Sequence, residues 1–206
     1  TLCDKIKAGK FIVTSEIGPP KGIDIKEMIE DAELIKGKVD AINVTDLQSS
    51  VMRLGSLAVC HLLKDKAIEP IFQITCRDRN RLALQSDLLS AAALGIENVL
   101  ALTGDYTTLG DHPEAKPVFD LGSIELLDVI KSLQEGSDMK GNVLKGAPKF
   151  CVGAVVNPGA YPLNRWCSGV QPCFVMYWPP SPAQPAALEF PRSRRQSIRQ
   201  AQPYPG

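Results

Sequence analysis

Short apolar runs rich in β-branched residues alternate along residues 1–160 with longer segments whose apolar positions recur every three or four residues. Four runs begin 29 residues apart, and these are FIVTSE from Phe11, DAINVT from Asp40, EPIFQIT from Glu69 and NVLALT from Asn98. A fifth run, FCVGAVVN, begins at Phe150. Runs of this kind predict buried strands, and their regular alternation with helices predicts a parallel sheet covered by helices.

The segments between these runs predict four amphipathic helices. The first has a candidate capping box, Asp24 with Glu27, and the last has Ser123 as a candidate cap. The apolar stripes are Ile25, Met28, Ile29, Ala32 and Ile35; Leu54, Leu57, Ala58 and Leu62; Leu82, Leu89, Ala92 and Ala93; and Ile124, Leu127, Ile130 and Leu133.

Two α/β architectures fit this alternation, an open doubly wound sheet and a (β/α)8 barrel. The sequence has neither the GxGxxG pattern nor a P-loop. Polar residues stand at the end of each predicted strand: Ser15 and Glu16; Asn43, Thr45 and Asp46; Gln73 and Thr75; Thr103, Gly104 and Asp105; and Asn157. In a barrel these ends converge on one face, where barrel enzymes carry their chemistry. We therefore expect a (β/α)8 barrel truncated to about five of its eight units, with two unpaired strand edges.

Residues 161–206 differ in composition from residues 1–160. They hold nine of the 16 prolines, five Arg, no Lys and a single acid, Glu189, so their net charge is +4 against −4 for residues 1–160. They show no sustained helical or alternating period, which predicts an irregular or disordered tail. Two explanations stay open, a genuine extension and a frameshift or cloning junction near residues 161–165. The second is favoured because the regular pattern stops within a motif.

Composition narrows the classes of function and location. The 23 basic and 23 acidic side chains cancel, which argues against nucleic-acid binding, and no apolar run is long enough to span a membrane. The start, TLCDKIKAGK, has no signal-peptide pattern and no Met, which is compatible with a cytoplasmic protein and a start inside a longer gene product. Six cysteines without CxxC spacing indicate reduced thiols, and His61 and His112 have no partners at metal-ligand spacing, so no metal is expected.

Four motifs at the predicted strand ends resemble methylenetetrahydrofolate reductases, most closely the corrinoid-associated bacterial and acetogen branch. They are SEIGPPKG (15–22), QITCRDRN (73–80), LALTGDYTTLGDHPEAKPVFDLGS (100–123) and VGAVVNPGA (152–160), and the resemblance covers about residues 5–164. It implies a (β/α)8 barrel that binds FAD and reduces 5,10-methylenetetrahydrofolate to 5-methyltetrahydrofolate. NAD(P)H or another electron donor would supply the reducing equivalents, and by analogy a partner subunit or a homo-oligomer is a further candidate.

The resemblance assigns two catalytic and substrate-binding carboxyl groups. Glu16 matches the general acid that protonates the folate bridge nitrogen, a role that requires a pKa raised by partial burial. Asp105, in LTGD, matches a carboxylate that stabilises the resulting iminium, and Gly104 lets the main chain approach the flavin. Without the resemblance, a solvent-exposed strand-end Glu and a turn Asp are the simpler interpretations.

Further residues are assigned to flavin binding by the same resemblance. Gln73 stands where the enterobacterial type has a His, and Thr103 where that type has an Arg, which leaves the electron donor open. The full set of flavin-binding candidates is Thr45, Asp46, Gln73, Thr103, Gly104, Asp105, Phe119, Asp120, Asn157 and Tyr161.

Several alternatives remain. Arg77, Asp78 and Arg79 in RDRN predict either an ion-pair network or an anion grip, but a helix start capped by Asp78 or Asn80 is favoured. The TQ-aromatic segment that contacts folate in the family is absent from this sequence, so reduced activity is expected of this chain. The alternatives to a reductase are a different (β/α)8 enzyme and a non-catalytic subunit that uses a partial barrel as a docking surface.

Overall fold

The computed structural model describes the main chain of residues 1–156, 174–177 and 199–200, and the side chains of residues 1–155. Within this part, the helices are α1 (Leu2–Lys7), α2 (Lys26–Ile35), α3 (Ser56–Asp65), α4 (Arg81–Ala93) and α5 (Ser123–Gln134), with short 3-10 helices η1 (Gln48–Ser50) and η2 (Thr107–Leu109). The strands are β1 (Val13–Ile17), β2 (Ala41–Val44), β3 (Pro70–Thr75), β4 (Asn98–Leu102), β5 (Cys151–Val156), β6 (Phe174–Tyr177) and β7 (Arg199–Gln200). The five predicted strands are confirmed, each starting within two residues of its predicted start.

All strand pairs of the sheet are parallel, and the strand order is β6-β5-β4-β3-β2-β1-β7. From β1 to β6 the spatial order follows the sequence, so each connection advances in the same direction across the sheet. A doubly wound sheet reverses its order at a switch point. The consecutive order therefore decides between the two predicted architectures, and the α/β fold is that of a truncated (β/α)8 barrel.

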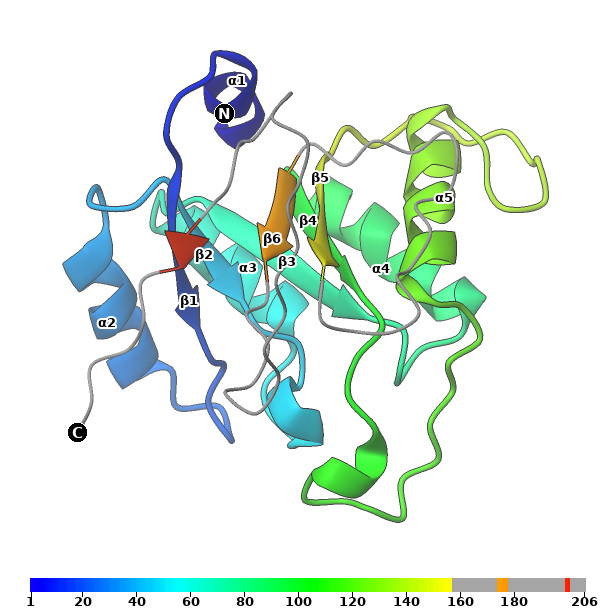
Figure 1. Ribbon diagram of the computed structural model, residues 1–206, viewed down its shortest axis with the longest axis horizontal. Coiled ribbons are helices and arrows are strands. Elements are labelled where there is room, and N and C mark those ends of the chain that lie inside the picture. Colours follow the sequence, from blue (N-terminus) through cyan, green and yellow to red (C-terminus); the bar gives the residue numbers. More distant parts are fainter. Residues whose placement is uncertain (157–173, 178–198, 201–206) are drawn as a thin grey trace, which may run out of the picture.

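Each strand sends alternate side chains to two different hydrophobic clusters. The larger cluster packs the outward side chains of the strands, such as Val44, Phe72 and Ile74, against the helices. The smaller cluster collects the inward residues Ala41, Ile71, Leu100 and Cys151 together with Leu2 and Ile12. Helices thus cover one face of the curved sheet, with α2 and α5 at opposite sides of it (Figure 1).

Helix α1 closes the interior at the amino ends of the strands, where Leu2 packs with Ala41 and Cys151 (Figure 1). Thr1 caps this helix through its Oγ1, which accepts a hydrogen bond from the Asp4 main-chain N at 3.3 Å. The sequence pattern did not predict this helix because six residues are too few to show a period. The opposite, carboxyl ends of the strands remain the place where the polar residues gather.

The predicted stripes of two helices are only partly confirmed, since Leu57 of α3 and Ala92 of α4 pack against the larger cluster but other members do not. In α4 the buried residues are Leu84, Leu88 and Ala91, whereas Leu82 is 74% exposed. In α3 the buried residues are Ser56, Val59, Cys60 and Leu63, and Ala58 is exposed. Both segments are apolar on most sides, so the sequence offers several stripes, and contact with the sheet selects one. The stripes of α2 and α5 are confirmed by the burial of Met28, Ala32, Leu127, Ile130 and Leu133.

Two predicted helix caps also differ. The N-cap of α2 is Ile25, and Asp24 accepts a hydrogen bond from the Lys26 main-chain N at 3.1 Å, so the predicted capping box does not form. The N-cap of α5 is Gly122 rather than Ser123, and Glu125 Oε2 accepts a hydrogen bond from the Gly122 N at 3.0 Å.

Strands β6 and β7 lie in the segment for which the sequence predicts an irregular tail. Phe174–Tyr177 extends the sheet beside β5, and Arg199–Gln200 pairs with Val13 and Thr14 of β1. For these six residues the prediction of an irregular tail is wrong, because a sheet edge offers main-chain partners that even a four-residue β-rich segment can use. The rest of residues 161–206 lies outside the described residues.

Candidate active site

Three polar side chains face the interior of the sheet on β1, β2 and β3. The outward positions of β2 and β3 are Ile42, Val44, Phe72 and Ile74, so Asn43 and Gln73, which alternate with them, point inward. Glu16 is paired with Asn43 in the register of β1 and β2 and shares its face. Asn43 and Gln73 are buried, and Glu16 is half-buried. The interior is therefore apolar near α1 and polar toward the carboxyl ends.

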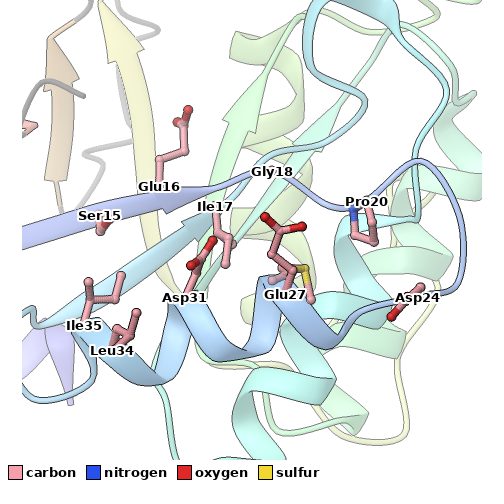
Figure 2. A pocket seen from close by; sticks show the side chains of 11 residues that line it. Ser15, Glu16, Ile17, Gly18, Pro20, Asp24, Glu27, Asp31, Leu34 and Ile35 are labelled. Carbon is pink, nitrogen blue, oxygen red and sulfur yellow. The ribbon is translucent and has the colours of Figure 1, made fainter. Parts of the chain in front are cut away.

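The turn after Glu16 is fixed by the neighbouring loop. The Pro19 carbonyl accepts a hydrogen bond from Arg53 Nη1 at 3.0 Å, and the Pro20 carbonyl accepts one from the Leu54 main-chain N at 2.9 Å. Figure 2 shows Glu16 leaving β1 on the side away from α2, whereas Ile17 points toward that helix. The alternation of side chains along β1 thus sets the direction of Glu16, and the Gly-Pro-Pro turn fixes the loop that follows it.

A groove of about 540 Å³ lies between β1 and α2 and is acidic. The described residues that line it include Glu16, Asp24, Glu27 and Asp31, and none of them is basic. Figure 2 shows Glu27 and Asp31 projecting from α2 toward the strand. The Glu16 side chain lies on the opposite side of β1 from these two carboxylates (Figure 2).

Asp46, at the end of β2, is the centre of a buried ion-pair network. Its carboxylate accepts hydrogen bonds from Ser56 Oγ at 3.1 Å, from the Thr75 N and Oγ1 at 2.9 and 2.8 Å, and from Arg79 Nη1 and Nη2 at 2.7 and 3.2 Å. Burial alone would lower the pKa of Arg79, but Asp46 and Asp87 outweigh it, and the pKa is raised. Because these partners occupy both carboxylate oxygens, we assign Asp46 a positioning role.

Thr45, next to Asp46, is also buried and interacts with the main chain of β1. Its Oγ1 lies 3.5 Å from the Ile17 carbonyl of the neighbouring strand. Together, Thr45 and Asp46 tie the carboxyl ends of β1, β2 and β3 to one another.

Arg77 is the largest fully buried side chain of the described part and binds main-chain carbonyls of two loops. It donates from Nη1 to the Asp105 carbonyl and from Nη2 to the Leu47 carbonyl, both at 3.2 Å, and forms an ion pair with Asp78 at 2.7 Å. Asn80 Oδ1 caps α4 by accepting hydrogen bonds from the main-chain N of Leu82 and Ala83. The ion-pair network and the Asn80 cap are therefore both confirmed.

Gly104 lies against this arginine in a conformation that requires glycine. Its φ is +95°, and a Cβ at this position would lie 3.0 Å from Arg77 Cβ and 3.2 Å from Thr75 Cβ. The next residue, Asp105, is exposed, while its carbonyl is held by Arg77 and by Ser50 Oγ at 3.2 Å. The main chain is thus fixed and the Asp105 side chain is left accessible.

Asp111 connects three loops at this end of the sheet. It forms an ion pair with Lys21 from the loop after β1, accepts a hydrogen bond from the Met52 main-chain N at 3.0 Å, and contacts His112 Nδ1 at 2.9 Å. These hydrogen bonds, with Lys21 first, hold the pKa of Asp111 well below its usual range. The adjoining Gly110 has no room for a side chain, because a Cβ there would overlap the Ser50 carbonyl.

The other flavin-binding candidates surround the start of α5. Thr103 Oγ1 donates to Ser123 Oγ at 3.1 Å, and the Phe119 ring packs edge-on against Tyr106 with centroids 5.7 Å apart. Asp120 binds Arg81 through both oxygens at 2.8 Å, and this arginine lowers the pKa of Asp120 to about 2. Asn157 and Tyr161 lie outside the described residues.

Other side chains add no separate site in the described part of the chain. No group of three or more His, Cys, Asp or Glu residues there is arranged to hold a metal ion, and no described helix is long and apolar enough to cross a membrane. His61 forms a pair with Asp65 at 3.8 Å on the same helix. Burial raises the pKa of the Cys60 thiol, and it raises that of Cys76 to about 12.

Comparison with known proteins identifies the family. A family model described as methylenetetrahydrofolate reductase matches residues 1–172. The chain belongs to the methylenetetrahydrofolate reductase family. A search of curated proteins found no match to the chain. The match covers all the strand-end residues described above, and the family is one of oxidoreductases that generally depend on a flavin.

The residues of this reductase-family site fit a group with polar atoms at its edge, such as a flavin. Asn43 Oδ1 is a buried acceptor without a hydrogen-bond partner among the described residues. The Gln73 amide is also inward and buried. These features place polar atoms at the same end of the sheet.

Sequence reasoning missed the residues that assemble this end of the sheet. For Arg77 the sequence predicts an ion-pair network or an anion grip, not a buried side chain that holds two loops, and it does not single out Ser50 or Asp111. Leu47, Ser49 and Ser50 all have positive φ, at 48°, 55° and 58°. The sequence signal for such a loop is weak, because none of these residues is Gly or Asn.

Proposed function

We propose that this chain carries the FAD- and folate-binding part of a methylenetetrahydrofolate reductase, which reduces 5,10-methylenetetrahydrofolate to 5-methyltetrahydrofolate. The observation that carries this proposal is the position of Glu16. It stands inside the sheet at the carboxyl end of β1, beside Asn43 and followed by a rigid turn. Partial burial of a carboxyl group disfavours its charged form, which suits a group that must hold a proton near neutral pH.

Glu16 is the proposed general acid. Its carboxylic acid gives a proton to the bridge nitrogen of the folate, the C–N bond of the five-membered ring opens, and Glu16 becomes a carboxylate. The substrate becomes a cationic iminium, which accepts hydride.

Asp105 is the proposed partner of the iminium. Its carboxylate is exposed while Arg77 and Ser50 fix its carbonyl, so the negative charge can be presented to a cation without rearrangement of the main chain. A preorganised charge stabilises a developing opposite charge more effectively than mobile water does. Arg77 and Ser50 are thus positioning residues for Asp105.

The proposed FAD site extends from Gln73, Thr45 and Gly104 across to Thr103, Phe119 and Asp120. When bound, FAD supplies the hydride that reduces the folate. Gln73 offers an amide to a ring atom. Asn157 and Tyr161 belong to the proposed site by resemblance only. NAD(P)H or another donor is the proposed source of electrons.

The test combines binding and single-turnover kinetics on the full chain. We expect FAD to bind, with a titratable change in flavin absorbance, and Glu16→Gln to bind FAD as wild type does. The same variant should slow folate reduction by about 10²–10⁴-fold while flavin reduction by the donor remains near normal. The matched control is Glu30→Gln, the same change on the exposed side of α2.

Two outcomes would contradict the proposal. A chain that takes up no FAD would instead favour the non-catalytic partial-barrel subunit. Equal losses in both half-reactions for Glu16→Gln would show that Glu16 is structural.

A further inference from the structure

The interior of the sheet contains a buried acceptor that no described group uses. Asn43 is fully buried, and its Oδ1 has no hydrogen-bond partner among the described residues. The orientation of the amide is set by its other end, because Nδ2 faces the Ser15 carbonyl at 3.5 Å and an oxygen placed there would be repelled. A buried, unsatisfied carbonyl oxygen is unfavourable unless something donates to it in the working protein.

Glu16 is the neighbour best placed to donate. It is the register partner of Asn43 on the adjacent parallel strand, and both side chains point into the interior. Adjacent strands lie about 4.8 Å apart, so side chains at paired positions are within contact distance of each other. Figure 2 shows the Glu16 side chain on the side of β1 away from α2, as its position in the strand requires.

The chemistry of the pair depends on protonation. A carbonyl oxygen can only accept a hydrogen bond, and an ionised carboxylate can also only accept. Asn43 Oδ1 and Glu16 can therefore be hydrogen-bonded only while Glu16 carries its proton. We propose that Asn43 is a positioning residue that accepts a hydrogen bond from the carboxylic acid of Glu16 and so keeps this general acid protonated and oriented.

This inference rests on the proposed function and adds a step to its cycle. When Glu16 transfers its proton to the substrate nitrogen, the hydrogen bond to Asn43 is lost, and two acceptor oxygens then face each other. Their repulsion favours uptake of a proton from solvent by Glu16 after the product leaves. Asn43 thus resets the acid without itself gaining or losing a proton.

Charged groups of both signs stand on the elements next to β1. Asp24, Glu27 and Asp31 line the groove on the α2 side of β1, the side from which the Glu16 side chain points away (Figure 2). Among the described cations of the neighbouring loops, Lys21 is paired with Asp111 and Arg53 donates to the Pro19 carbonyl. On the remaining side, β7 places Arg199 opposite Val13, three residues before Glu16.

The test measures the titration of Glu16 in the full chain without flavin or folate. Glutamate is labelled with ¹³C at the carboxyl carbon, the Glu16 signal is assigned by its loss in Glu16→Gln, and its chemical shift is followed against pH. We expect a midpoint at least one unit above the ordinary Glu value of about 4.3. Asn43→Ala should lower that midpoint by about one unit or more, because the acid loses its acceptor.

A matched control separates this role from a general effect of polar groups inside the sheet. Thr14 Oγ1 is likewise buried without a hydrogen-bond partner among the described residues, on the same face of β1. Thr14→Val should leave the Glu16 midpoint unchanged. Asn43→Ser is a second, smaller change, whose hydroxyl can donate to the ionised acid, and it should also lower the midpoint.

A wild-type midpoint near 4.3, or equal midpoints in wild type, Asn43→Ala and Asn43→Ser, would overturn the proposal. The wild-type titration alone suffices to decide against it if neither variant folds. Because this measurement uses no folate and no FAD, its failure leaves the proposed reduction standing. Conversely, a chain that fails to reduce folate can still show the Asn43-dependent midpoint.

Discussion

Replacing Asp46 by Asn should destabilise the protein far more than the same change at Asp120, although both carboxylates bind an arginine at close range. Asp46 pairs with Arg79 at 2.7 Å, and its side chain is fully buried. Asp120 pairs with Arg81 at 2.8 Å, but at the surface. The comparison tests whether burial, rather than geometry, decides how much each ion pair contributes to the free energy of unfolding.

The magnitude follows from what Asp46→Asn leaves unpaired. One carboxylate oxygen accepts from Thr75 N, Thr75 Oγ1 and Arg79 Nη1, and an amide nitrogen at that place would face these donors. Removing one partner of a buried ion pair costs about 3–5 kcal/mol. Arg79 keeps its second partner, Asp87, at 2.8 Å, so we expect the lower end, about 3 kcal/mol.

The assay is urea unfolding followed by circular dichroism. With a slope of about 2 kcal/mol per molar urea, a loss of about 3 kcal/mol lowers the midpoint by about 1.5 M. Asp120→Asn should leave the midpoint close to that of wild type because solvent screens the exposed pair. Equal midpoint shifts for the two variants would refute the reasoning, and so would a shift below about 0.5 M for Asp46→Asn.

Two further predictions concern the strand-end loops and the thiols. Asp111→Asn should increase hydrogen exchange in residues 18–24 and 48–53, which Asp111 joins. Because the folded-state pKa of Asp111 is depressed, its contribution is fully present above the unfolded value of about 3.9 and is lost as pH falls below it. Wild-type protection should therefore persist from pH 7 to about 5 and decline below about 4, and protection that is equal in both proteins would contradict this role. Cys60 and Cys76, whose thiol pKa values are raised by burial, should resist iodoacetamide at pH 8 in the native protein, as measured by mass spectrometry of the alkylated peptides. Alkylation of Cys76 as fast as that of the partly exposed Cys3 would show that the packing is wrong.

The helices show where sequence reasoning lost precision. For α2 and α5 a single apolar stripe exists, and the structure buries it. In α4 the sequence LALQSDLLSAAA offers apolar residues on nearly every side, and the predicted stripe through Leu82 proves to face solvent. Periodicity can choose a face only when the other faces are polar.

The sequence also predicted the candidate site only in part. Strand-end motifs place Glu16, Gln73 and Asp105 at one end of the sheet, and their positions are confirmed by parallel pairing in consecutive order. The same motifs did not show that Asp46 is occupied by Arg79, Ser56 and Thr75, or that Arg77 holds the Asp105 carbonyl. Those contacts join residues about 10 to 33 positions apart, and no local pattern encodes them.

The sequence by itself determined the alternation of strands and helices, because burial of strands and of one helix face imposes its own period of apolar residues. The tertiary structure alone decided which polar groups face each other. It brought Asn43 beside Glu16 through the register of β1 and β2, and it gave Phe174–Tyr177 a partner at the edge of β5. Both depend on main-chain hydrogen bonds between strands, which any side chain permits and which composition therefore does not reveal.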